Sequence, residues 1–143
     1  MRPIQRICLL GFGEVGRTLA EDLGKLSGLQ LTAFDLLFAE KETSASKNLL
    51  ACPHVVGYQQ AQEAVVEAQL VISAVTAAQD LRAAQSITEA LPKDCWFLDL
   101  NSVAPETKRH AAQLIEGVGG RYVEAAVMSP IHPLRSKSPM LLG

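Results

Sequence analysis

The sequence lacks the features that mark several classes of protein. It has three cysteines in 143 residues and 5% aromatic residues. No apolar run approaches the roughly 20 residues that span a bilayer. Neither sign of charge dominates, since 13 Lys and Arg stand against 15 Asp and Glu, for a formal charge of −2. The composition therefore predicts no membrane segment and no basic surface that would bind nucleic acid.

The cysteines also argue against a disulfide framework. Cys8, Cys52 and Cys95 are odd in number, widely spaced and form no Cys-x-x-Cys pair. Cys8 and Cys95 lie inside apolar runs, where a thiol acts as a small hydrophobic group. We expect buried, reduced thiols, no metal site and a cytoplasmic protein.

What is present is the composition of one globular domain. Apolar residues make up 48% of the chain and charged residues 20%, which is enough apolar surface to offset the entropy of ordering. The length is typical of a single domain, and residues 1–143 are interpreted as one. The final residues, Met140 to Gly143, resemble the opening of another buried strand. We therefore interpret the sequence as the first domain of a longer protein.

Apolar runs of strand length alternate with segments of helical period along the chain. The predicted strands are Ile7–Leu10, Leu29–Asp35, His54–Gly57, Leu70–Val75, Trp96–Leu100 and Tyr122–Val127. The predicted helices are Val15–Leu26, Ser44–Ala51, Ala61–Ala68, Leu81–Leu91 and Pro105–Ile115. Continuous apolar strands joined by helices are typical of an α/β protein with a doubly wound parallel sheet.

A glycine-rich turn joins the first predicted strand to the first predicted helix. It runs Gly11, Phe12, Gly13, Glu14, Val15, Gly16 and matches Gly-x-Gly-x-x-Gly. In this context the first glycine permits the tight turn, the second admits a pyrophosphate and the third lets the helix pack close to the strand. The N–H groups at the helix start favour the diphosphate. The pattern predicts a Rossmann-type dinucleotide-binding domain, with an ordinary strand–helix turn as the alternative.

Asp35 ends the second predicted strand. A carboxylate there accepts hydrogen bonds from the hydroxyls of the adenosine ribose and repels a 2′-phosphate. No arginine follows it directly; the next residues are Leu36, Leu37 and Phe38. The sequence therefore favours NAD over NADP. The alternative is that Asp35 merely caps the end of the strand.

Two further loops follow predicted strands, where ligands of open α/β sheets bind. Val75 and Thr76 end the fourth strand, and Asn101 and Ser102 follow the fifth. We expect all four to contact the cofactor. Ser102 could equally be the N-cap of the helix that begins at Pro105, and Asp99, within the strand, could be structural or functional.

With these residues in place, the chain resembles the β-hydroxyacid dehydrogenases, the superfamily of 6-phosphogluconate and 3-hydroxyisobutyrate dehydrogenases. The glycine turn is similar to the family's Gly-x-Gly-x-Met-Gly, and the stretch 99–105 to its Asp-x-Ser-Thr-x-Ser-Pro, with Ser102 at the position of the cofactor-contacting Thr. Residues 74–76 and 124–130 correspond to the family's fourth-strand and substrate loops. More narrowly, the chain resembles uncharacterised NAD-binding, phosphogluconate-dehydrogenase-like proteins.

The resemblance implies an oxidoreductase that transfers hydride between a nicotinamide cofactor and a small hydroxy acid. The family's catalytic lysine lies in an all-helical second domain, so the resemblance places no catalytic residue in this chain. It also implies a homodimer for the full-length protein. We accordingly expect residues 1–143 alone to be inactive. The rival interpretation is a non-catalytic NAD-binding or sensor module.

The predicted substrate loop departs from the family pattern. Met128 stands where the family has a serine, and Pro130 stands where it has a glycine. Ser129 could take the role of the substrate-loop serine only if the loop were shifted by one residue. His132 and Arg135 follow, and a cationic pair there could hold a substrate carboxylate or phosphate. Met128, Ser129, His132 and Arg135 are thus the candidate substrate-binding residues, with a solvated loop as the alternative.

Overall fold

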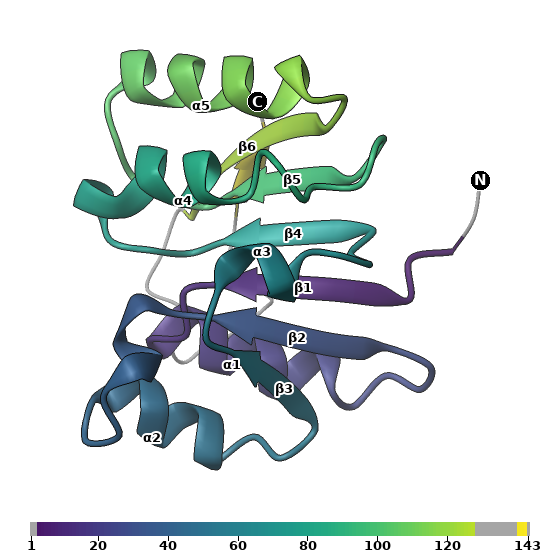
Figure 1. The fold of residues 1–143 in the computed structure, drawn as a ribbon, viewed down its shortest axis with the longest axis vertical. Coiled ribbons are helices and arrows are strands. Elements are labelled where there is room, and N and C mark those ends of the chain that lie inside the picture. The colour runs from purple at the N-terminus through teal and green to yellow at the C-terminus, as the bar shows by residue number, and fades with distance from the viewer. Residues whose placement is uncertain (1–2, 128–139, 143) are drawn as a thin grey trace.

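The fold is built on one twisted sheet, shown in Figure 1. A computed structural model describes residues 3–127 and 140–142 of the chain. Within them the strand order is β3-β2-β1-β4-β5-β6-β7. The strands are β1 (Arg6–Leu10), β2 (Gln30–Phe34), β3 (Val55–Tyr58), β4 (Leu70–Ser73), β5 (Trp96–Asp99), β6 (Arg121–Val127) and β7 (Met140–Leu142). β1 to β6 pair in parallel, whereas β7 lies antiparallel to β6.

Helices connect the parallel strands and cover both faces of the sheet. They are α1 (Glu14–Leu23), α2 (Ser44–Leu50), α3 (Ala61–Ala64), α4 (Asp80–Ser86) and α5 (Pro105–Gly117), with 3₁₀ turns η1 (Leu36–Ala39) and η2 (Ala77–Gln79). In the described part of the chain, each helix is too short or too polar to cross a membrane.

The alternation of side chains along β1 separates two apolar cores. Cys8 and Leu10 point to one face, where they join residues of α3, α4 and α5 such as Ile115. Ile7 and Leu9 point to the other face, which α1 and α2 cover. Because both faces are buried, the strands read as continuous apolar runs. The doubly wound architecture predicted from the sequence is confirmed.

The predicted strands are confirmed within a residue or two, but several helices are shorter than predicted. α1 ends at Leu23 and not at Leu26, which is 58% exposed and contributes nothing to the core. α3 ends at Ala64 and α4 at Ser86, although Ala68 and Leu91 are buried. Apolar residues of the connecting loops therefore continued the helical period without being helical. The strand expected at the end of the sequence is β7, and it pairs antiparallel with β6.

All three cysteines are buried and free, as predicted. Burial raises the pKa of Cys8 to about 12, and also that of Cys95 to about 12, so both stay protonated thiols. His54, directly before β3, lies beside the end of α1. Its Nε2 is 2.8 Å from the carbonyl oxygen of Ala20.

The packing of α5 on the sheet predicts a sharp contrast between two truncations. Ile115 is fully buried, whereas Leu50, the last residue of α2, is 82% exposed. We expect Ile115→Ala to lower the free energy of unfolding by about 2–5 kcal/mol, because it leaves a cavity. The matched control Leu50→Ala should change it by less than about 0.5 kcal/mol. Urea titration followed by circular dichroism measures both, and equal effects would contradict the assignment of the core.

Candidate functional site

The turn after β1 requires glycine at its first position. Gly11 has φ +93°, a conformation that side chains rarely adopt. A Cβ atom there would also collide with the carbonyl of Ala74, directly after β4. The Gly11 N–H donates to the carbonyl of Phe34 at 2.8 Å and so extends the pairing of β1 with β2. The turn is thus held against both neighbouring strands.

The other two glycines act at the start of α1. A Cβ atom on Gly16 would collide with the carbonyl of Gly11, so glycine is needed for the close packing of the helix on the turn. Gly13 is the N-cap residue, with φ −79°, and a Cβ atom on it would meet no protein atom within 4 Å. The protein itself therefore does not require glycine at position 13.

Two polar side chains hold the peptide groups of Phe12. The Phe12 N–H donates to Asp35 Oδ2 at 2.7 Å, and its carbonyl accepts from Asn48 Nδ2 at 3.0 Å. The other oxygen of Asp35, Oδ1, accepts from the Leu37 N–H at 2.9 Å and caps the η1 turn. The Phe12 ring is buried and packs edge-on against Phe38, with centroids 6.1 Å apart. Asp35 therefore does cap the end of its strand, while each carboxylate oxygen keeps lone pairs for a further donor.

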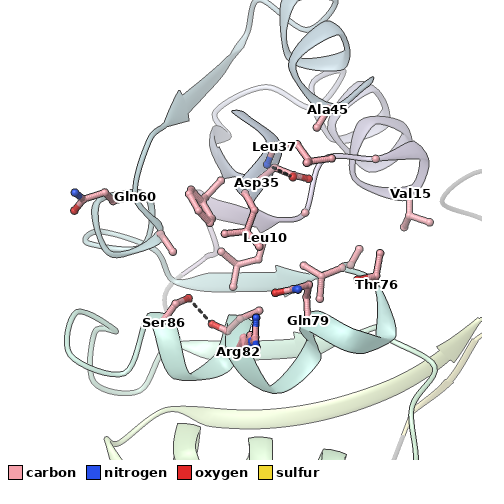
Figure 2. A pocket seen from close by; sticks show the side chains of 18 of the residues that line it. Leu10, Val15, Asp35, Leu37, Ala45, Gln60, Thr76, Gln79, Arg82 and Ser86 are labelled. Atoms are coloured by element: carbon pink, nitrogen blue, oxygen red, sulfur yellow. Dashed lines mark hydrogen bonds between the residues drawn. The ribbon is translucent and has the colours of Figure 1, made fainter. Parts of the chain in front are cut away.

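A cavity of about 900 Å³ opens at the carboxyl edge of the sheet beside this turn. Figure 2 shows it between two walls: Asp35 and Leu37 lie on one side, and Gln79 of η2 with Arg82 and Ser86 of α4 lies on the other. Gln60, before α3, borders the cavity at one end and Thr76 at the other. The volume is within the range of small-molecule and cofactor pockets.

The structure separates the predicted cofactor-binding residues into two groups. Those that line the cavity are Gly11, Gly13, Glu14, Val15, Asp35, Val75 and Thr76. Phe12, Gly16 and Asn101 are buried, and Ser102 is exposed but does not border the cavity. The alternative that Ser102 caps α5 is wrong, because the N-cap residue is Ala104. Met128, Ser129, His132 and Arg135 lie outside the described residues.

Asn101 connects two of the loops at this edge. Its side-chain Oδ1 accepts from the Val75 N–H at 2.7 Å, so the residue after β5 holds the loop after β4. Its Nδ2 donates to Ser73 Oγ at 3.0 Å and to Asp80 Oδ1 at 2.7 Å. The side chain of Asn101 is therefore engaged within the protein.

Several cavity residues were missed by sequence reasoning. Gln60 follows β3, whose carboxyl end meets the same edge, so the rule that located Val75 and Asn101 could have found it. Gln79, the N-cap residue of α4, and Arg82 and Ser86 within this helix reach the cavity only because of the orientation of the helix. No local sequence signal marks them.

The parallel strand order, the glycine turn and the cavity at its helix N-terminus define a Rossmann-type α/β domain. Comparison with known families identifies it further. Residues 6–129 match the NAD binding domain of 6-phosphogluconate dehydrogenase, and the chain belongs to that family. No curated protein sequence matches the chain significantly.

Solved structures share this fold. A conserved hypothetical protein from Sinorhizobium meliloti is 34% identical, with a TM-score of 0.85 over 98% of this chain and 47% of its own. A conserved protein of unknown function, described as similar to 3-hydroxyacid dehydrogenases, is 27% identical, with a TM-score of 0.80 over 96% and 49%. The Mycobacterium tuberculosis 3-hydroxyisobutyrate dehydrogenase, 24% identical with a TM-score of 0.76 over 90% and 42%, shares the fold. The chain spans about half the length of these proteins.

Proposed function

We propose that this chain binds NAD in the cavity beside the glycine turn and forms the cofactor-binding part of an oxidoreductase that acts on a small hydroxy acid. The observation that carries the proposal is Gly13. It is the N-cap residue of α1, it lines the cavity, and no protein atom lies within 4 Å of the place that a Cβ atom would take. A glycine that the fold does not need is explained by a ligand that approaches its backbone.

The residues around the cavity fit a dinucleotide. The N–H groups at the start of α1 and the helix dipole suit the diphosphate. Asp35 offers its remaining lone pairs to ribose hydroxyls, while Val75 and Thr76 line the side toward β4. When bound, the nicotinamide supplies the hydride chemistry. The protein's part is to bind and orient the cofactor.

The residues after β2 favour NAD over NADP. Asp35 is fixed by hydrogen bonds from Phe12 and Leu37, so its charge stays at the cavity wall. Leu36 and Leu37 also line the wall and are exposed, and neither provides a cation for a 2′-phosphate.

The proposed substrate class is inferred from related proteins. The 3-hydroxyisobutyrate dehydrogenase among the solved structures suggests a small hydroxy acid as substrate. The family resemblance implies that a catalytic group and a dimer contact come from an all-helical second domain. Met128, Ser129, His132 and Arg135 remain the candidate substrate-binding residues.

The substitution Gly13→Val tests whether the open space at Gly13 is occupied by the pyrophosphate of NAD. The variant should fold as the wild type does, because a Cβ atom at position 13 meets no protein atom within 4 Å. Its side chain should occupy the space of the pyrophosphate and abolish NAD binding in calorimetric titration. The matched control is Gly117→Val at the end of α5, also in open space and away from the cavity. The control should bind NAD normally; normal binding by Gly13→Val would contradict the proposal.

Leu36→Arg tests the source of cofactor preference. The wild type should bind NAD more tightly than NADP. Leu36 is 61% exposed, so arginine fits there and can pair with a 2′-phosphate. We expect NADP affinity to rise about tenfold, which is about 1.4 kcal/mol. Leu50→Arg adds the same charge at an exposed residue that does not line the cavity and should leave both affinities unchanged. Wild-type preference for NADP would show that Asp35 does not contact the ribose.

The 143-residue chain should bind NAD without oxidising hydroxy acids. A general base typically contributes about 10²–10⁴-fold and must reach the moving proton, and the family places its lysine in the second domain. The assay follows NADH absorbance with a panel of small hydroxy acids. Turnover by the wild type that disappears in His132→Ala would contradict this expectation and make His132 the base.

A further inference from the structure

Four polar side chains form a buried cluster beneath the carboxyl ends of β4 and β5. They are Ser73, Asp80, Asp99 and Asn101, and none is more than 4% exposed. The cluster is separate from the cavity lining, yet Asn101 touches that lining through the Val75 N–H. The cluster contains two carboxyl groups. Burying both in the ionised form is energetically unfavourable, because each loses its hydration and the two charges repel.

The hydrogen bonds of the cluster leave one oxygen without a donor. Asp99 Oδ1 accepts from the Asn101 N–H at 2.9 Å, and Asp99 Oδ2 accepts from the Tyr122 hydroxyl at 2.7 Å. Asp80 Oδ1 accepts from Asn101 Nδ2 at 2.7 Å. Asp80 Oδ2 is buried and receives no hydrogen bond from any residue in 3–127 or 140–142. A proton on Oδ2 would turn this orphaned acceptor into a donor.

The neighbouring charges support a proton on Asp80. Burial, followed by the neighbouring Asp99 carboxyl, raises the pKa of Asp80 to about 6. Lys108 of α5 acts in the opposite direction, and its ammonium also lies 4.0 Å from Glu124 of β6. Burial and the hydrogen bond to Asp99 also raise the pKa of Tyr122, which therefore remains a donor. No third His, Cys, Asp or Glu of the described residues completes a metal site here.

We propose that Asp80 and Asp99 share one proton and that this pair positions the cofactor pocket. The protonated Asp80 donates to Asp99 and accepts from Asn101 Nδ2. Asn101 is thereby held with its Oδ1 toward the Val75 N–H, and the loop after β4 is fixed beside the cavity. Asp80 and Asp99 are positioning residues, since neither lines the cavity. The proposal rests on the proposed binding of NAD.

The shared proton makes the pocket sensitive to pH. The Asp80 carboxyl has an ordinary pKa of 3.8 in the unfolded chain and loses its proton near that pH, while the folded protein keeps the proton to about pH 6. Stability from this group is therefore present at acidic pH and is lost as pH rises through that window. Above it two buried negative charges repel, and the hold of Asn101 on Val75 weakens.

The test compares NAD affinity at about pH 5 and about pH 8, on either side of the loss of the proton. We expect the wild type to bind NAD about tenfold more weakly at the higher pH. Asp80→Asn keeps one acceptor for Asn101 and one donor for Asp99 without a titrating proton, so its affinity should not change with pH. Glu89→Gln removes an exposed acid from the connection after α4 and should retain the wild-type pH profile.

A second measurement does not depend on NAD. Carboxyl ¹³C NMR of the free protein should show one of the two aspartates titrating well above the ordinary range, and that titration should be missing in Asp80→Asn. Both carboxyls titrating near their ordinary values would overturn the shared proton. Wild-type and Asp80→Asn proteins with the same pH profile for NAD would overturn the positioning role. Failure of the wild type to bind NAD at either pH would instead overturn the proposed function, whatever the NMR titration gives.

Discussion

The close approach of the Gly11 backbone to the carbonyl of Ala74 is the constraint on which the rest of the site depends. Only a residue without a side chain, at φ +93°, lets the chain turn there while β1 stays paired with β4. The same turn brings the start of α1 to the carboxyl edge of the sheet, and Gly16 lets α1 pack against it. The cavity exists because this turn is tight.

The fold was predictable from the sequence because its signals are local and repeated. Buried parallel strands such as β4 read as apolar runs, and the glycine turn stands between one strand and one helix. Helix ends were less predictable, because Leu26 continues the apolar period of α1 although the chain has already left the helix. The spacing of apolar residues indicates the apolar face of a helix, but it does not show at which residue the helical backbone hydrogen bonds end.

The site was predictable in part for the same reason. Asp35 and Val75 follow strands, so the topology places them at the cavity. Asn101 was expected to contact a ligand, but its amide instead joins Val75, Ser73 and Asp80 inside the protein. Arg82 reaches the cavity from the side of a helix. Such positions depend on how helices pack on the sheet, which is a long-range property that no short motif encodes.

The central claim is that NAD lies along the carboxyl edge, with its diphosphate at the start of α1. Amide ¹H–¹⁵N NMR with added NAD tests it most directly, because it reports where on the protein the ligand binds. The account predicts large shifts for Gly13, Glu14 and Val15 and for Val75, with none along the outer part of α5. Shifts confined to the second, smaller cavity around Arg6, Gln30 and Glu67, toward the amino ends of β1 and β2, would contradict it.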